Sequence, residues 1–179
     1  MERNNVVLVN DDDSAIAVME KLEAHRKGLL HRAFSIFIFN SQDEMLLQQR
    51  AGNKYHGGGL WTNACCSHPQ WGEDIKQSAA QRLQYEMGIS CDLEHLFKFT
   101  YRATVENNLI EHELDYIFAG YTDATPSINI GEVQNYRWIR PETLILELQS
   151  QPEIFTAWFK VLAGRVIAEF QRKKKVRDT

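Results

Sequence analysis

Two carboxylates close together in the sequence are the first residues that could do chemistry. Glu111 and Glu113 stand two positions apart, so in an extended strand they project from the same face, together with Asp115. Neighbouring carboxylates repel, and such a pair is tolerated when it is exposed, when it binds a cation, or when one member holds a proton. A solvated strand face and a catalytic or metal site therefore both remain open from these residues alone.

Three histidines spread along the chain are candidates for a metal site with these carboxylates. His25, His31 and His68, combined with Glu111 and Glu113, give a nitrogen and oxygen donor set suited to Mg²⁺, Mn²⁺ or Zn²⁺. A single histidine is more often structural or exposed, and no compact motif such as HExxH joins the three. The spacing by itself supports a metal site only weakly.

The segment 57–69 is the least ordinary part of the sequence, and it reads Gly-Gly-Gly-Leu-Trp-Thr-Asn-Ala-Cys-Cys-Ser-His-Pro. Three glycines in a row allow backbone N–H groups to approach an anion, although a glycine-rich turn before a strand of small residues explains them equally well. If the strand is extended, Cys65 and Cys66 face opposite ways. One thiol can then enter a site while the other packs as a small apolar group.

Several charged and aromatic side chains could bind an anion or a cation near these groups. In the helix predicted at 73–87, Arg82 and Glu86 are four positions apart and share a face, either as a surface ion pair or as an anion-binding arginine and a cation-binding carboxylate. Trp158 has the helical spacing of a core residue, but an indole face also stabilises positive charge. The further candidate cations are Lys21, Arg50 and Lys54.

Hydrophobic periodicity predicts the elements that must position these side chains. Strands are predicted at 6–9, 33–39, 45–49, 97–104, 109–120 and 136–139, with the second and third forming a hairpin and the fourth and fifth an antiparallel pair. Helices are predicted at 73–87, 141–148 and 153–170. Strands before, between and after helices indicate an α/β (α+β) fold, a mixed sheet flanked by helices.

Length and composition limit the possible classes of protein. The 179 residues are 44% hydrophobic, which predicts one domain over 1–179, with a core at about 30–160 and a C-terminal helix at 153–175. A net charge of -4 argues against a nucleic-acid binder. The sequence has three cysteines, no signal peptide and no apolar run of roughly 20 residues, which predicts a cytoplasmic protein without membrane partners. We expect a monomer or weak homodimer.

Four separated motifs resemble the type I isopentenyl-diphosphate isomerases and occur in that family's order. They are Asn63-Ala64-Cys65-Cys66-Ser67-His68-Pro69, His31-Arg32-Ala33-Phe34-Ser35, Tyr101-Arg102-Ala103 and Glu111-His112-Glu113. The resemblance covers about 20–158. It implies a Nudix-like mixed-sheet sandwich and an isomerase of isoprenoid biosynthesis that interconverts isopentenyl diphosphate and dimethylallyl diphosphate.

The same resemblance implies a role for each matching side chain. The implied catalytic residues are Cys66, Glu113 and Tyr101, the tyrosine that hydrogen-bonds the glutamate. The implied ligands of Mn²⁺ or Zn²⁺ are His25, His31, His68, Glu111 and Glu113. Glu86 is the implied ligand of the Mg²⁺ that accompanies the diphosphate. The implied substrate-binding residues are Lys21, Arg50, Lys54, Arg82 and Trp158.

The predicted helix at 73–87 departs from the hydrolase motif GX5EX7REUXEEXGU of the wider superfamily. Glu73 and Glu86 are kept, but Arg82 and Tyr85 replace two metal-binding carboxylates, and Ser67 replaces the first glycine. A diphosphohydrolase needs those carboxylates to hold cations around the pyrophosphate, so this activity is the less favoured alternative. A catalytically silent metal- or nucleotide-binding module is a third reading.

The implied reaction sets demands that the candidate residues can meet. Protonating an isolated alkene needs a strong, positioned acid and surroundings that tolerate a tertiary carbocation. We expect a protonated Glu113 and Cys66 to exchange protons on opposite faces of the carbon chain, with Trp158 stabilising the cation by roughly 2 kcal/mol or more. Which of the two residues donates is not decided by the sequence.

Overall fold

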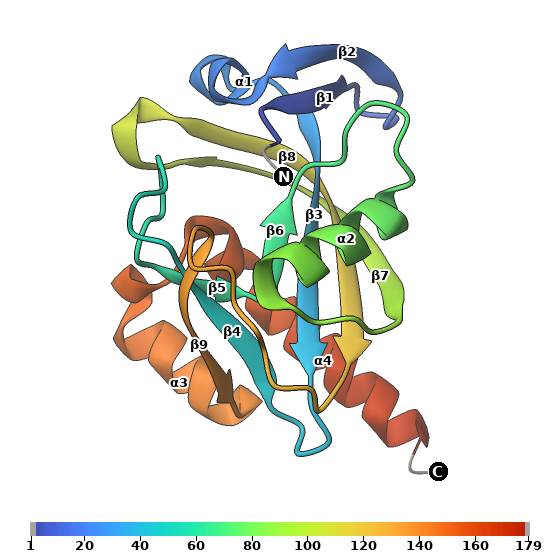
Figure 1. Ribbon diagram of the computed structural model, residues 1–179, viewed down its shortest axis with the longest axis vertical. Helices are drawn as coiled ribbons and strands as arrows, with labels where there is room; N and C mark the ends of the chain where they lie inside the picture. Colours follow the sequence, from blue (N-terminus) through green and yellow to red (C-terminus); the bar gives the residue numbers. More distant parts are fainter. Residues whose placement is uncertain (1–2, 178–179) are drawn as a thin grey trace.

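The computed structural model describes residues 3–177 (Figure 1). Within them the strands are β1 (Asn5–Val9), β2 (Ala15–Glu20), β3 (His31–Phe39), β4 (Met45–Arg50), β5 (Trp61–Asn63), β6 (Cys65–Ser67), β7 (Leu93–Thr104), β8 (Ile110–Tyr121) and β9 (Val133–Ile139). The helices are α1 (Lys21–Lys27), α2 (Ile75–Met87), α3 (Pro141–Ser150) and α4 (Ala157–Arg177), with 3-10 turns η1 (Glu106–Asn108) and η2 (Pro152–Ile154). None of these helices is both long and apolar enough to cross a membrane.

The sheet is mixed, as predicted, and β3 lies at its centre. β3 runs parallel to β8, with His31 opposite Glu113, and antiparallel to β6, with Ser35 opposite Cys66. On its other side β8 pairs antiparallel with β7, where Tyr101 also lies opposite Glu113. This pairing gathers side chains from four strands at one end of the sheet.

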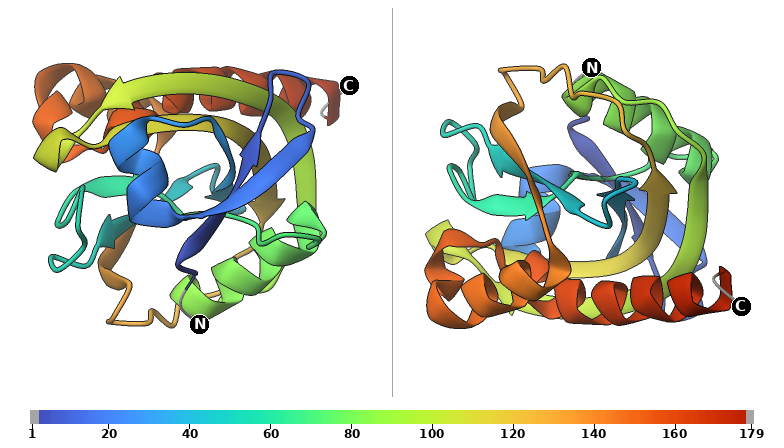
Figure 2. Two further views of the ribbon diagram at one scale, coloured as in Figure 1. Left: turned by 90° about the horizontal axis from the view of Figure 1, so that it is seen from above. Right: turned by 90° about the horizontal axis from the view of Figure 1, so that it is seen from below.

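Two hydrophobic cores lie on the two faces of the sheet, because successive side chains of β3 point to opposite faces. Phe37 and Phe39 pack in the core that includes α4, and Ile36 and Ile38 pack in the core that includes α2. Figure 2 shows α2 and α4 on opposite sides of the curved sheet. Burying each such side chain contributes about 1.5–3 kcal/mol to the stability of the sheet that carries the site.

Helix α2 has clear start and stop signals. The carboxylate of Asp74 accepts from the N–H of Gln77 at 2.8 Å and caps the helix, so α2 begins at Ile75, two residues after the predicted start at 73. Gly88 ends it in the left-handed region at φ 66°, and a Cβ at this position would lie 2.7 Å from the carbonyl oxygen of Ser127. Only glycine fits this turn without displacing backbone.

The structure corrects several predicted elements. The predicted hairpin is wrong for most of its length, because β3 and β4 meet only at Phe39 opposite Met45 and β4 instead pairs with β5 and β9. The C-terminal helix begins at Ala157 and follows η2. β2, α1 and β5 were not predicted, because they are short or, for β2, mostly exposed. β6 corresponds to the strand of small residues that was considered as one alternative for this segment. The ends of the predicted domain, residues 1–2 and 178–179, lie outside the described residues.

Candidate active site

The candidate residues surround one cavity of about 380 Å³. Ten of them line it, namely Lys21, Arg50, Lys54, Cys66, His68, Arg82, Glu86, Glu111, Glu113 and Trp158. The other three, His25, His31 and Tyr101, are buried directly behind this wall and contact Glu111 or Glu113. All thirteen residues, from eight strands and helices and the loops between them, therefore lie close together.

The carboxylates of β8 are buried, so the solvated strand face considered above is wrong. Glu111, Glu113 and Asp115 are 3%, 7% and 1% exposed. The hydroxyl of Tyr101 lies 2.8 Å from Oε2 of Glu111 and 2.7 Å from Oε2 of Glu113. A hydroxyl carries one hydrogen and donates to one carboxylate at a time, so the second oxygen needs a proton or a cation of its own.

Two buried histidines face these carboxylates. Nδ1 of His25 lies 2.7 Å from the carbonyl oxygen of Lys21, and Nδ1 of His31 lies 2.8 Å from that of Leu29. A carbonyl only accepts, so each Nδ1 carries a hydrogen and each Nε2 is the atom that faces a carboxylate. Burial acts to lower the pKa of His25, but Glu111 and Glu113 outweigh it and raise that pKa. These Nε2 atoms lie 3.6 and 3.5 Å from carboxylate oxygens without a hydrogen-bond partner, an arrangement that calls for a proton or a cation between them.

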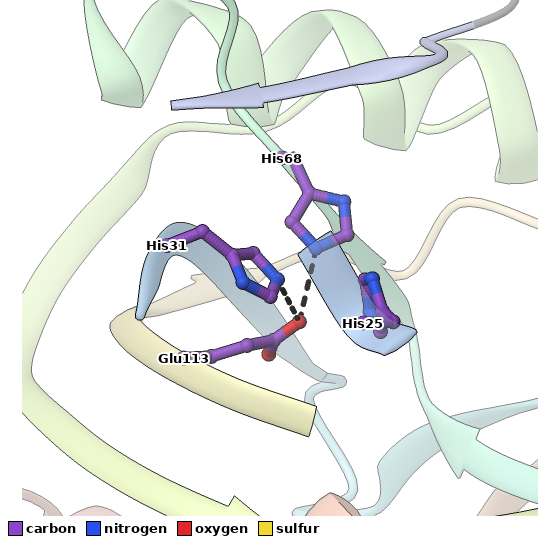
Figure 3. A group of neighbouring side chains, drawn as sticks. All are labelled: His25, His31, His68 and Glu113. Atoms are coloured by element: carbon purple, nitrogen blue, oxygen red, sulfur yellow. Dashed lines mark hydrogen bonds and ion pairs between the residues drawn. The ribbon is translucent and has the colours of Figure 1, made fainter. Parts of the chain in front are cut away.

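His68 completes this group, as Figure 3 shows. The ligand atoms of His25, His31, His68 and Glu113 all lie within 4.8 Å of one another, and Nε2 of His68 is 2.9 Å from Oε1 of Glu113. Burial lowers the pKa of His68 to about 4. Burial also acts to raise the pKa of Glu113, but the neighbouring imidazoles of His31 and His68 outweigh it and hold that pKa well below its usual range. A neutral imidazole beside an ionised carboxylate is the donor state that a divalent metal needs.

Cys66 and Cys65 face opposite ways, as the alternation predicted. Cys65 packs in the core under α2, whereas Cys66 lines the cavity. Sγ of Cys66 donates to Oδ1 of Asn63 at 3.0 Å and accepts from Nε1 of Trp158 at 3.1 Å. Burial raises the pKa of the Cys66 thiol to about 12, with a smaller contribution from the charge of Asp115. The sulfur is therefore protonated at neutral pH.

Cations line another part of the cavity wall. Burial lowers the pKa of Lys21, and the neighbouring charges of Lys54 and Arg50 lower it further. The Arg50 guanidinium lies 5.2 Å from the ring centroid of Trp158, and its Nε is buried without a hydrogen-bond partner. Within the described residues neither Lys21 nor Arg50 forms an ion pair, so this region is suited to an anion.

Arg82 and Glu86 form a buried pair, so the surface ion pair considered above is wrong. They are 7% and 5% exposed, and the Arg82 guanidinium donates to Glu86. The side-chain amide of Gln48 also donates to Glu86, at 3.1 Å. Glu132, which the sequence analysis missed, binds Lys54 and lies 3.5 Å from Arg82. Its place just before β9, next to Gly131, gave no sequence signal for a site.

His56 is the histidine that the sequence analysis missed. It is 6% exposed and lines the cavity, with Nε2 at 3.0 Å from Oε1 of Glu111. Burial lowers its pKa to about 4. The only signal in the sequence was its position immediately before the three glycines that the analysis singled out.

Comparison with known proteins agrees with this fold and site. The NUDIX domain family matches residues 29–159. Among solved structures, a protein from Deinococcus radiodurans superposes with a TM-score of 0.77 at 19% identity, covering 90% of this chain and 98% of that one. A MutT protein from Methanosarcina mazei gives 0.64 at 21% identity, covering 82% and 96%. At these identities the likeness concerns the fold, which is that of a NUDIX domain.

Curated relatives are more specific. The isopentenyl-diphosphate Delta-isomerase of Pectobacterium atrosepticum is 49% identical over 93% of both chains, and that of Serratia proteamaculans is 50% identical over 86% of both. An isopentenyl-diphosphate Delta-isomerase 1 of Aromatoleum aromaticum is 46% identical over 92% of this chain and 93% of its own. The chain belongs to the isopentenyl-diphosphate Delta-isomerase family of NUDIX domain proteins.

Proposed function

We propose that this protein is an isomerase that interconverts isopentenyl diphosphate and dimethylallyl diphosphate in isoprenoid biosynthesis. The observation that carries the proposal is the cavity itself. A thiol, Cys66, and a buried carboxylate, Glu113, line the same space, and cations line another part of its wall. The names of the curated relatives support the same activity.

The substrate's diphosphate fits the cationic part of the cavity. Its anionic oxygens would be bound by Lys21, Arg50, Lys54 and Arg82, where Lys21 and Arg50 have no carboxylate partner among the described residues. Glu86 would hold Mg²⁺ against the same oxygens, since hard oxygen ligands suit this ion. Fixing the charged head in this way places the short hydrocarbon tail among the remaining residues of the wall, near Trp158.

A second divalent ion, Mn²⁺ or Zn²⁺, fits the group His25, His31, His68, Glu111 and Glu113. The unpartnered Nε2 atoms that face carboxylate oxygens support this assignment, because an ion between them replaces repulsion by attraction. When bound, the ion supplies positive charge that lowers the repulsion between the carboxylates and orients Glu113. The hydrogen bond from Tyr101 holds the same carboxylate from the other side.

The proton inventory of the cavity suits an isomerisation. Each turnover adds one proton to the alkene and removes one from the neighbouring carbon of the resulting tertiary carbocation, so one group must hold a proton and another must be free to take one. Burial raises the pKa of Cys66 to about 12, so the thiol would hold its proton, and the neighbouring imidazoles keep the pKa of Glu113 well below its usual range, so this carboxylate would be free to take one. This differs from the protonated Glu113 expected from the sequence. Trp158, whose N–H donates to the Cys66 sulfur, would stabilise the cation through its ring.

Hydrolysis is less well supported. In α2, Arg82 and Tyr85 stand in place of carboxylates, and Glu73 is bound by Arg3 and Ser78 outside the cavity wall. Only Glu86 of this helix brings a carboxylate to the cavity among the described residues. Too few ligands are left in the helix to hold several cations around a pyrophosphate.

The test is an assay of purified protein with isopentenyl diphosphate and Mg²⁺, with and without chelator, following dimethylallyl diphosphate and released phosphate. We expect isomer without phosphate release, and turnover at least about 10²-fold lower in Cys66→Ala and in Glu113→Gln. Phosphate release without isomer would refute the proposal. The proposed setting is the cytoplasm, as a monomer or weak homodimer, and light scattering of the purified chain measures the latter.

A further inference from the structure

His56 lies against the proposed Mn²⁺ or Zn²⁺ site but is not among the residues that the family resemblance assigned to it. Its Nε2 is 3.0 Å from Oε1 of Glu111, the same oxygen that lies 3.6 Å from Nε2 of His25. The ligand atoms of His25, His56 and Glu111 lie within 4.8 Å of one another, as do those of the group that includes His31, His68 and Glu113. His25 belongs to both groups, so the two are continuous.

The loop that carries His56 is held firmly on both sides. The Arg50 guanidinium donates to the carbonyl oxygen of His56 at 3.2 Å, and the side-chain amide of Asn107 donates to the carbonyl oxygen of Tyr55 at 2.9 Å. The His56 ring packs edge-on against Trp158, with centroids 5.7 Å apart. A buried imidazole fixed in this way loses little conformational entropy when it binds a ligand.

The distances around each of the two carboxylates suit ligands of a metal ion. Adjacent ligands of a zinc ion with bonds of about 2.1 Å lie roughly 3.0 to 3.4 Å apart. Nε2 of His56 lies 3.0 Å and that of His25 lies 3.6 Å from Oε1 of Glu111, whereas Nε2 of His68 lies 2.9 Å and that of His31 lies 3.5 Å from Oε1 of Glu113. Nε2 of His25 is buried without a hydrogen-bond partner, which indicates that it binds a ligand. It faces Oε1 of Glu111, the same oxygen that Nε2 of His56 faces.

We propose that His56 is a further ligand of the divalent metal centre, next to His25 and Glu111. This inference rests on the metal site of the proposed function and extends it to a fourth imidazole. Additional nitrogen ligands favour borderline metals such as Zn²⁺ over Mg²⁺, which prefers oxygen. The centre is then distinct in chemistry from the Mg²⁺ held by Glu86 with the diphosphate.

The first experiment is a crystal structure of the wild-type protein loaded with Zn²⁺. We expect Nε2 of His56 at a bonding distance of about 2.1 Å from the zinc. A zinc bound by the other histidines and carboxylates, with His56 bonded only to Glu111, would overturn the inference. This experiment uses no variant, so its outcome does not depend on whether a mutant folds.

The second experiment measures Zn²⁺ affinity by competition with a chromogenic chelator, without substrate. His56→Gln keeps an N–H that can donate to Glu111 but replaces the imidazole by an amide, a weak metal ligand, and we expect at least about tenfold weaker binding. His95→Gln, on the exposed part of β7, is the matched control and should bind as wild type does. Equal affinity in His56→Gln and wild type contradicts the inference.

The two proposals fail separately in these measurements. Zinc bonded to His56 in a protein without isomerase activity would refute the proposed function and leave the ligand assignment intact. Full isomerase activity in a protein whose zinc does not contact His56 would do the reverse.

Discussion

Removing the Tyr101 hydroxyl tests whether the buried carboxylate pair depends on a shared donor. Tyr101→Phe keeps the ring, which stacks on Phe99 with centroids 6.0 Å apart, and deletes a hydroxyl that lies within hydrogen-bond distance of both Glu111 and Glu113. A hydrogen bond to a charged group is worth about 1.5–3 kcal/mol. We expect the free energy of unfolding in the presence of chelator to fall by this amount, which for a chain of this length corresponds to a midpoint about 3–12 °C lower.

The assay is thermal unfolding followed by circular dichroism, first with chelator and then with Mn²⁺. Because a bound cation gives the carboxylates another partner, the difference between Tyr101→Phe and wild type should be smaller with Mn²⁺. Tyr85→Phe is the control, since its side chain is 41% exposed on α2 and surface changes usually stay within about 0.5 kcal/mol. Unchanged stability of Tyr101→Phe in chelator would refute the argument that the two carboxylates need this donor.

Three other predictions follow from the core, the cations and the thiol. Phe159→Ala, at a fully buried ring that stacks on Phe37 and Phe155, should lower the free energy of unfolding by about 3–5 kcal/mol in urea titrations; a loss below about 1 kcal/mol would contradict the packing described. Arg50→Met removes charge-assisted bonds and should weaken inhibition by inorganic pyrophosphate roughly 10- to 150-fold, whereas undiminished inhibition would exclude Arg50 from the anion site. Burial raises the pKa of Cys66 from 9.0 to about 12. The protonated thiol therefore contributes fully to the free energy of unfolding below about pH 9, and this contribution is lost as the pH rises toward 12. Cys66→Ala should therefore lose less stability than wild type between neutral and alkaline pH, as measured by urea midpoints, and an equal loss would contradict the raised pKa.

Much of the site was accessible from the sequence because alternation along a strand is a local property. The common face of Glu111 and Glu113 and the opposite directions of Cys65 and Cys66 follow from a period of two residues, and both hold in the structure. Burial of the carboxylates did not follow in the same way. It depends on α1 and the loop at His56, which cover β8 and whose positions are set by contacts distant in the sequence.

His56 and Glu132 could not be predicted for a related reason. Each lies in a connection without periodicity, and each connection is held by at least one partner far along the chain. The loop at His56 is bound by Asn107 and Arg50, and Glu132 is bound by Lys54. A single charged residue in a loop is normally solvated, so only tertiary structure distinguishes these two from ordinary surface residues.

The register of two strand pairs decides whether the chemistry can occur at all. Glu113 lies opposite His31 on β3 and opposite Tyr101 on β7, so the carboxylate receives its imidazole and its hydroxyl through direct cross-strand pairing. A slip of one residue would turn Glu111 and Glu113 to the other face and bring His112 and Leu114 into their place. The wrong register would also bury polar side chains of β8 among the apolar residues under α2. The hydrophobic cores on the two faces of β3 thus select the same register that assembles the carboxylates, the histidines and Cys66 around one cavity.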